Sequence, residues 1–216
     1  MNIQQHCCGL QKLFNDKQAR KDLKRLRKKG PNKPTRILLQ YLDQLNIPQM
    51  TLLDIGGGVG AIQMVLAQKG IQAITGVDAS PAYLQAAQQI AREMGYLEKA
   101  RFIYGNFIEK ASEVESADIV TLDRVLCCFP DVHALVTHSV QKARQVYGVI
   151  FPRDNFLTKL GATVLNLVLM LLRNPFRTYV HSTAVVDLLV QRQGFETWQV
   201  ATAGVWQVRV YRRTNV

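Results

Sequence analysis

The residues best suited to chemistry lie at positions 52–61, where the sequence reads LLDIGGGVGA. A carboxylate, Asp54, ends an apolar run and is followed closely by four glycines. A strand, a glycine turn and a helix in this order place backbone N–H groups at a helix N-terminus, and glycines let a ligand approach that backbone closely. The segment Gly56–Ala61 fits the G-x-G-x-x-A fingerprint of dinucleotide-binding proteins. A glycine-rich turn that binds no ligand is the alternative.

The carboxylate that precedes the glycines distinguishes between ligands. Asp54 would repel a pyrophosphate, but it would attract a ligand that carries an ammonium and a sulfonium group. S-adenosylmethionine is such a ligand. Further polar side chains follow the next apolar runs, namely Asp78, Asn106 and Asp123. If these runs are parallel strands, their carboxyl ends meet at one edge of the sheet, where folds of this type bind ligands.

In this order, the segments resemble the motifs of class I S-adenosylmethionine-dependent methyltransferases. Leu53–Gly60 looks like their motif I, D-x-G-x-G-x-G, and Asp78 matches the acidic end of their second strand, where a carboxylate accepts both ribose hydroxyls. Asn106 stands where the family usually has Asp, so it keeps an acceptor for the adenine amino group but loses the charge. The resemblance implies a cofactor site made of Asp54, Gly56, Gly58, Gly60, Asp78, Asn106, Phe107 and Asp123. The alternatives are helix-capping roles for Asp78 and Asp123, and a nicotinamide enzyme as the class.

Apolar runs alternate with helical periods from about residue 50 to residue 152. Such alternation implies right-handed crossovers and a parallel sheet that is covered on both faces. Two further alternating runs, 196–203 and 205–212, meet at Gly204 and predict an antiparallel pair at the sheet edge. We therefore predict an α/β fold of the Rossmann-like type, a doubly wound seven-stranded sheet that is mostly parallel with one antiparallel strand at the edge.

The charge of the chain is unevenly distributed. The net charge is +11, and nine of the 27 Lys and Arg residues lie in residues 12–29. This balance predicts an anionic partner without choosing between nucleic acid, anionic lipid and acidic metabolites. We expect a basic N-terminal helical segment at residues 1–48 and the methyltransferase-like domain at residues 49–216, with an apolar helical insertion at about 156–180. We expect the basic stretch to fold over the cofactor cleft as a solvated helix, and peripheral contact with an anionic membrane is the alternative.

The four cysteines occur as two adjacent pairs, Cys7-Cys8 and Cys127-Cys128. Adjacent cysteines rarely bond to each other and zinc sites usually space their cysteines more widely, so we expect neither disulfides nor a metal. His6 beside the first pair leaves a metal site as an alternative hypothesis. Reduced thiols and an N-terminus that does not read as a signal peptide indicate a cytoplasmic protein. The uncharged apolar stretch 160–172 is short for a transmembrane helix, so no such helix is expected.

The second half of the chain is similar to the magnesium-protoporphyrin O-methyltransferases. The similar segments are Val125–Pro130, Phe151–Arg153, Tyr179–His181 and, near the N-terminus, Leu13–Asn15. The candidate catalytic histidine of that family falls on Cys128, and its N-terminal tyrosine falls on Leu13. The acid/base groups that the resemblance implies are therefore replaced in this sequence.

Methyl transfer is an in-line displacement, for which an enzyme mainly aligns the nucleophile and excludes water. A hydroxyl or thiol acceptor also needs a base, whereas a carboxylate acceptor does not. We predict His181 as the base or a substrate contact, Arg153 as an anchor for an anionic group, and Cys128 as a further catalytic position. The structural alternatives are a histidine bonded to a loop carbonyl, a surface arginine and an inert buried thiol.

The sequence thus predicts an S-adenosylmethionine-dependent methyltransferase with a small, hydrophobic or anionic acceptor. An RNA methyltransferase is the rival enzyme, favoured by charge, although Phe14 is the one aromatic residue in the basic stretch. Outside enzymes, the rival is a non-catalytic module that binds S-adenosylmethionine, because the expected histidine and tyrosine are missing.

Overall fold

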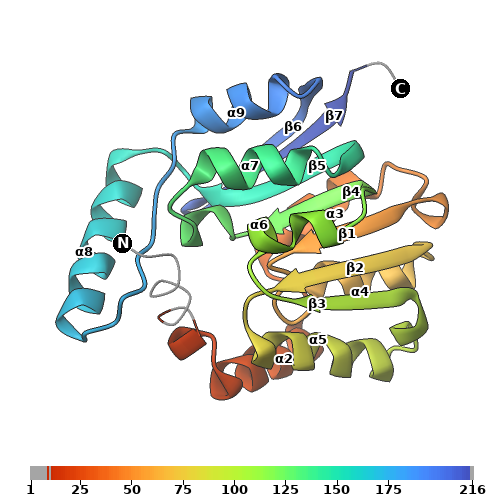
Figure 1. Ribbon diagram of the computed structural model, residues 1–216, viewed down its shortest axis with the longest axis horizontal. Helices are drawn as coiled ribbons and strands as arrows, with labels where there is room; N and C mark the ends of the chain where they lie inside the picture. Colours follow the sequence, from red (N-terminus) through yellow and green to blue (C-terminus); the bar gives the residue numbers. More distant parts are fainter. Residues whose placement is uncertain (1–8, 10, 215–216) are drawn as a thin grey trace.

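The computed structural model describes residue 9 and residues 11–214. A seven-stranded sheet forms the centre of the molecule (Figure 1). The strand order is β3-β2-β1-β4-β5-β7-β6. The first five strands are parallel to one another, while β7 runs antiparallel to both β5 and β6. The strands are β1 (Thr51–Ile55), β2 (Ala73–Asp78), β3 (Ala100–Tyr104), β4 (Ala117–Asp123), β5 (Ala143–Pro152), β6 (Phe195–Ala203) and β7 (Trp206–Arg213).

This arrangement confirms the predicted α/β fold and adds one detail. The strand that opposes the others is β7, which lies one place inside the edge, and β6 is outermost. The strand order also changes direction beside β1, because β2 and β3 extend to one side of β1 while β4 begins the other side. In open α/β sheets the crevice at such a switch point, outside the carboxyl ends of the strands, is where ligands bind.

Helices cover both faces of the sheet (Figure 1). One cluster of buried apolar side chains joins α2, α3, α4 and α5 to one face, and a second cluster joins α6, α7 and α9 to the other. The helices are α2 (Asp16–Lys29), α3 (Lys33–Leu42), α4 (Ala61–Gln68), α5 (Pro81–Glu93), α6 (Phe107–Lys110), α7 (Val132–Val140), α8 (Phe156–Leu171) and α9 (Thr183–Gln191).

Side-chain caps set the helix boundaries near the site. Ser80 caps α5 with Pro81 at its first position, and these are residue types that favour the two places. Within the basic stretch 12–29, Asn15 adopts an extended conformation and its side chain caps α2, which begins at Asp16. Gly30 then ends α2 with a φ of 67°, a backbone conformation that favours glycine.

The basic helix α2 packs against α5 and shares the core of the sheet. Leu23 is buried in the same apolar cluster as the residues of α3, α4 and α5. Arg27 donates two hydrogen bonds to the carboxylate of Glu93, at 2.6 and 3.1 Å. Just before α2, the Ser80 hydroxyl donates to the carbonyl oxygen of Phe14 at 2.7 Å. These contacts hold the N-terminal segment beside the glycine loop.

The apolar segment Phe156–Leu171 forms α8, which lies at the periphery of the molecule (Figure 1). Leu169 is the one buried residue of this helix. The Asn166 side chain binds α8 to the segment that connects it to α9. It donates a hydrogen bond to the Thr178 carbonyl oxygen and accepts one from the Thr178 N–H, each at 2.8 Å. Within the part of the chain that the structure describes, none of the helices combines the length and apolar character needed to cross a membrane.

Leu38 tests how α3 is held on the sheet. This side chain is fully buried over Gly148, where an added Cβ would lie 2.8 Å from Leu38 Cδ1. We expect Leu38→Ala to lower the free energy of unfolding by about 2–5 kcal/mol, because a cavity remains in a packed core. Urea titration measures the loss. Leu188→Ala on α9, where the side chain is 47% exposed, is the matched control. Equal losses in the two variants would contradict the packing.

Candidate active site

The glycine loop between β1 and α4 has a backbone that only glycine adopts without strain. Gly56, Gly58 and Gly60 have φ values of 62°, 55° and 79°. A Cβ at Gly56 would lie 2.5 Å from Val125 Cγ2, so the segment that follows β4 also packs tightly on the loop. The loop leads into the N-terminus of the eight-residue helix α4. It is therefore a backbone cradle of the predicted kind.

Asp54 supports this cradle from below. Its side chain is 1% exposed and accepts hydrogen bonds from Gln63 Nε2 at 3.0 Å and from Thr121 Oγ1 at 2.7 Å. An added Cβ at Gly57 would collide with the Asp54 carboxylate and the Gln63 amide, so the loop rests directly on them. Burial raises the pKa of Asp54 to about 7, and the two hydrogen bonds oppose that rise.

Asp78 connects the loop to the end of β2. Its carboxylate accepts from the Gly58 N–H at 3.0 Å and from the Ser80 N–H at 2.8 Å. Burial raises the pKa of Asp78. The helix cap of α5 is the Ser80 side chain, which accepts from the Tyr83 N–H. Asp78 therefore supports the turn, and its side chain borders a cavity.

Asn106, Phe107 and Asp123 lie at the ends of the neighbouring strands. The Asn106 side chain caps α6, and Phe107 is buried against the second apolar cluster. The Asp123 carboxylate accepts from Thr35 Oγ1 at 2.5 Å and from Arg124 Nε at 2.8 Å. All three side chains line the same cavity as Asp78.

Two cavities meet around the glycine loop. The larger has a volume of about 420 Å³ and extends from Asp78 past Asn106 to Leu165 on α8. The smaller, about 130 Å³, lies between the glycine loop and α2. Both are bordered by Asp22, Gly56, Gly58, Tyr83, Asp123 and Arg124. The site is therefore one elongated crevice at the switch point of the sheet.

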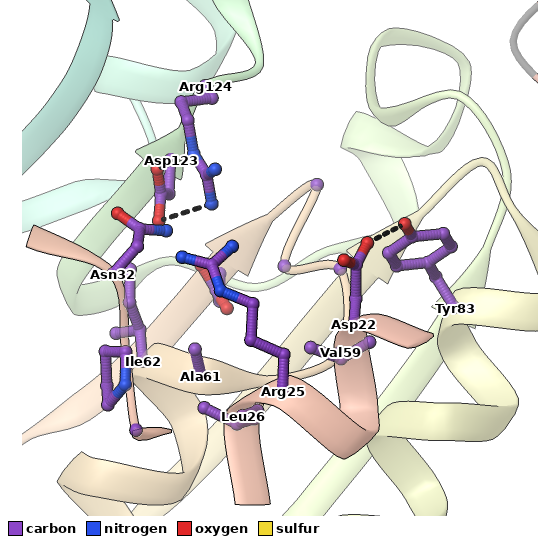
Figure 2. Close-up of a pocket in the computed structure, with 16 residues that line it drawn as sticks. Asp22, Arg25, Leu26, Asn32, Val59, Ala61, Ile62, Tyr83, Asp123 and Arg124 are labelled. Carbon is purple, nitrogen blue, oxygen red and sulfur yellow. Dashed lines mark hydrogen bonds and ion pairs between the residues drawn. The ribbon is translucent and has the colours of Figure 1, made fainter. Parts of the chain in front are cut away.

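Charged side chains of the smaller cavity were missed by sequence reasoning. Figure 2 shows Arg25 projecting from α2 over the crevice, with Asp22 bonded to Tyr83 beside it. The Tyr83 hydroxyl donates to Asp22 at 2.5 Å. Arg124 follows β4 with a φ of 61°, unusual for a residue other than glycine, and its guanidinium lies 6.0 Å from the Trp206 ring centre. The basic run signals a cationic helix, but it does not indicate which cation reaches the cavity.

The structure does not bring the three predicted catalytic residues together. Cys128 borders the larger cavity. His181 Nε2 lies 2.9 Å from the carbonyl oxygens of both Leu126 and Phe129, and burial lowers the pKa of this histidine. Neither His181 nor Arg153 is among the described residues that line the two cavities, and Arg153 is exposed.

No cluster suited to a metal ion occurs among the described residues. Cys127 and Cys128 lie with their sulfur atoms 3.8 Å apart. The alternative metal hypothesis also involved His6, Cys7 and Cys8, and these three residues lie outside the described part of the chain.

Comparison with known proteins agrees with the geometry. A family described as a methyltransferase domain matches residues 47–167. This is more than half of the chain, so the chain belongs to the methyltransferase domain family. Its fold is that of the class I enzymes, and the cofactor of this class is S-adenosylmethionine.

Individual relatives differ in what they methylate. The chain is 28% identical over 173 residues to the magnesium-protoporphyrin O-methyltransferase of Synechocystis sp., covering 77% of this chain and 70% of that protein. It is 24% identical over 179 residues to the ribosomal protein L11 methyltransferase of Clostridium perfringens, covering 82% of this chain and 47% of that protein. The chain thus spans about half the length of these L11 relatives.

Solved structures of similar fold include the magnesium protoporphyrin IX methyltransferase ChlM from Synechocystis PCC 6803 with bound SAH. The TM-score is 0.67 at 23% identity, with 84% of this chain and 82% of that chain covered. A geranyl diphosphate C-methyltransferase from Streptomyces coelicolor A3(2) gives a TM-score of 0.63 at 14% identity, with 83% and 78% covered. At these sequence identities, the similarity to the solved structures concerns the fold alone.

The donor set of the crevice fits S-adenosylmethionine. The crevice combines a backbone cradle with the carboxylates of Asp54, Asp78 and Asp123, which suit a cationic ligand and its hydroxyl groups. Arg25 adds a cation at the side of α2, where a ligand carboxylate would be neutralised.

The raised pKa of Asp54 predicts a pH-dependent stability. The ordinary pKa of an aspartate is 3.8, whereas the pKa of Asp54 in the folded protein is about 7, so the folded protein binds more protons than the unfolded chain between these limits. The stabilisation is fully present below pH about 4 and is lost as the pH rises through about 7. We therefore expect the stability difference between the wild type and Asp54→Asn to fall across this window, by at most ~1.4 kcal/mol per pH unit, and to level off above it.

Urea unfolding of both proteins at a series of pH values, without ligand, measures this difference. A constant offset from the lost hydrogen bonds does not affect the result, since only the slope with pH is compared. Parallel stability profiles across the whole window would show that Asp54 does not titrate with a raised pKa.

Proposed function

We propose that this protein transfers the methyl group of S-adenosylmethionine to a small molecule with an apolar body and an anionic group, such as a carboxylate. The observation that carries the proposal is the continuity of the crevice. One end is the glycine cradle with Asp54 and Arg25, and the other end is a larger, mostly apolar cavity with Arg124 at the junction. We assign this larger cavity to the adenosine part of the cofactor and to the acceptor. When bound, the cofactor supplies an electrophilic methyl group on a sulfonium, and the chain supplies alignment and a shielded cavity.

Different residues around the cradle bind different parts of the cofactor in this proposal. We assign Asp78 to the ribose hydroxyls and Asn106 with Phe107 to the adenine, since they line the cavity beyond the ends of β2 and β3. Arg25 is assigned to the ligand carboxylate, because a guanidinium can form two parallel hydrogen bonds with it. Asp54 acts through the loop it supports and through its charge.

The acceptor end offers no histidine or lysine as a base. Among the described residues that line the larger cavity there is neither a histidine nor a lysine. The hydrogen bond with Cys127, together with burial, holds the pKa of Cys128 well above its usual range, so its thiol stays protonated at neutral pH. A carboxylate acceptor needs no proton removed, and Arg124 can bind it. These observations support an anionic acceptor.

We propose a positioning role for His181 and a contact role for Cys128. His181 bonds to two carbonyl groups of the turn that carries Cys128, so it holds that turn against the cavity. Its lowered pKa suits a neutral imidazole in this role. Arg153 is exposed beyond the end of β5, and an acceptor long enough to leave the cavity would be needed to reach it.

Two other functions serve as outcomes of the tests. An RNA methyltransferase would use the cations of α2, and its binding to RNA would weaken steeply with salt. A non-catalytic module would bind S-adenosylmethionine without turnover. The relatives that methylate ribosomal protein L11 add a protein acceptor to these outcomes.

Calorimetric titration with S-adenosylmethionine, S-adenosylhomocysteine and NADH tests the cofactor site. We expect both sulfur ligands to bind in the micromolar range and NADH not to bind. Arg25→Ala is expected to weaken binding of the sulfur ligands roughly ten-fold, the cost of a charge-assisted hydrogen bond. Arg20→Ala, on the same helix but outside both cavities, is the matched control. Equal effects of the two variants would refute the role of Arg25.

Transfer of a labelled methyl group tests the acceptor. We expect label to enter apolar carboxylic acids and not their amides, because the amide has no anionic nucleophile. The expected reaction has the same rate with or without nuclease treatment of the mixture. Labelling of RNA or of ribosomal protein L11 would identify a macromolecular acceptor instead. Micromolar cofactor binding without transfer to any acceptor class would favour the non-catalytic module.

A further inference from the structure

Helix α8 turns its apolar face outward. Seven of its exposed apolar residues follow the spacing of one helical stripe, and their exposed fractions lie between 44 and 77%. Leu165 and Met170, on either side of this stripe, are 47% and 53% exposed. A surface helix of a globular protein normally buries such a stripe against the core. The stripe consists of Phe156, Leu157, Leu160, Val164, Leu167 and Leu171, with Val168 beside it.

The inner side of the helix is already occupied. Leu169 is buried, Leu165 borders the larger cavity, and Asn166 is bonded to the backbone of Thr178. Rotation of α8 to bury its outer stripe would break these contacts. The outward position of the apolar stripe is therefore built into the way the helix is anchored.

The surroundings of the stripe are cationic. Residues 153–177 contain four cations and a single acid, Asp154, which pairs with Lys159 at 2.6 Å. Arg153 and Arg173 lie just outside the two ends of α8 and are exposed. The whole chain carries a net charge of +11, which adds a longer-range attraction to an anionic surface. An apolar face with cations at its ends is the pattern of a helix that lies in a membrane interface.

We infer that α8 docks this protein on an anionic lipid surface, with its outer stripe in the acyl boundary and Arg153 and Arg173 at the level of the headgroups. The helix has 16 residues and is therefore about 24 Å long. This is shorter than a hydrocarbon core of about 30 Å, so α8 lies in the plane of the interface. Lys159 has the long aliphatic stem needed to keep its ammonium at the headgroup level. The inference concerns the outer face of α8 and stands independently of methyl transfer.

Sedimentation of the full chain with phosphatidylcholine vesicles, with and without phosphatidylglycerol, tests this inference. We expect binding to the anionic vesicles that weakens as salt is raised. The variant L160Q/V164Q/L171Q is expected to bind roughly ten-fold or more weakly, since each change removes a buried apolar side chain from the interface. Met94→Gln, at a 44% exposed apolar residue that follows α5, should bind as the wild type does. Unchanged urea unfolding of the triple variant confirms that it is folded.

The wild type and its variants also show whether something other than lipid covers the outer stripe of α8. Failure of the wild type to bind either kind of vesicle would overturn the inference. Equal loss of binding in Met94→Gln would also overturn it, because the effect would not belong to α8. A wild-type dimer that the triple variant converts to a monomer would make the stripe an interface between copies of this chain. Vesicle binding that appears only after deletion of residues 1–8 would make that segment the native cover of the stripe.

Discussion

The buried carboxyl group of Asp54 is the contact on which the rest of the site depends. The glycine loop lies directly on it, and Thr121 and Gln63 hold it from two other elements of the fold. Any larger residue at Gly57 would collide with this group. The Asp54 carboxyl group thus fixes the conformation of the loop, the start of α4 and the position of the Gly58 N–H. A buried acid is costly, and its raised pKa reflects that cost.

Above the loop, the charges are arranged from several elements at once. Asp78 fixes the far side of the loop through Gly58, while Asp123 is held between Thr35 of α3 and its neighbour Arg124. The basic helix α2 closes the remaining side and contributes Arg25 (Figure 2). The crevice carries positive and negative side chains at one end and apolar walls at the other. It therefore favours ligands that have charged groups at one end and an apolar part at the other.

The turn that contains Cys128 and the helix α8 border the part of the larger cavity that we assign to the acceptor. Two hydrogen bonds from His181 Nε2 reach the carbonyl groups of that turn, and the histidine ring stacks on Tyr179 with centres 5.8 Å apart. The residue that the magnesium-protoporphyrin family resemblance implied as a base is replaced by a thiol that stays protonated. Binding and shielding therefore account for this part of the site better than proton transfer does.

Much of the fold was readable from the sequence, because it rests on local patterns. The alternation of apolar runs and helical periods predicted the parallel strands, and the pair around Gly204 predicted β6 and β7. Helix α5 begins at Pro81 with Ser80 as its cap, and both are residue types that favour a helix start. The glycine spacing with Asp54 predicted the cradle, since only glycine adopts positive φ at Gly56, Gly58 and Gly60 without strain.

What tertiary structure alone decided is which side chains meet. Nine cations lie in residues 12–29, and the packing of α2 on α5 selects Arg25 from them. His181 and Arg153 were candidates because of their residue types, yet the fold directs one to backbone carbonyls and the other to the surface. The outward stripe of α8 has the same origin, because periodicity shows that a helix has an apolar face, while its anchoring contacts decide where that face points.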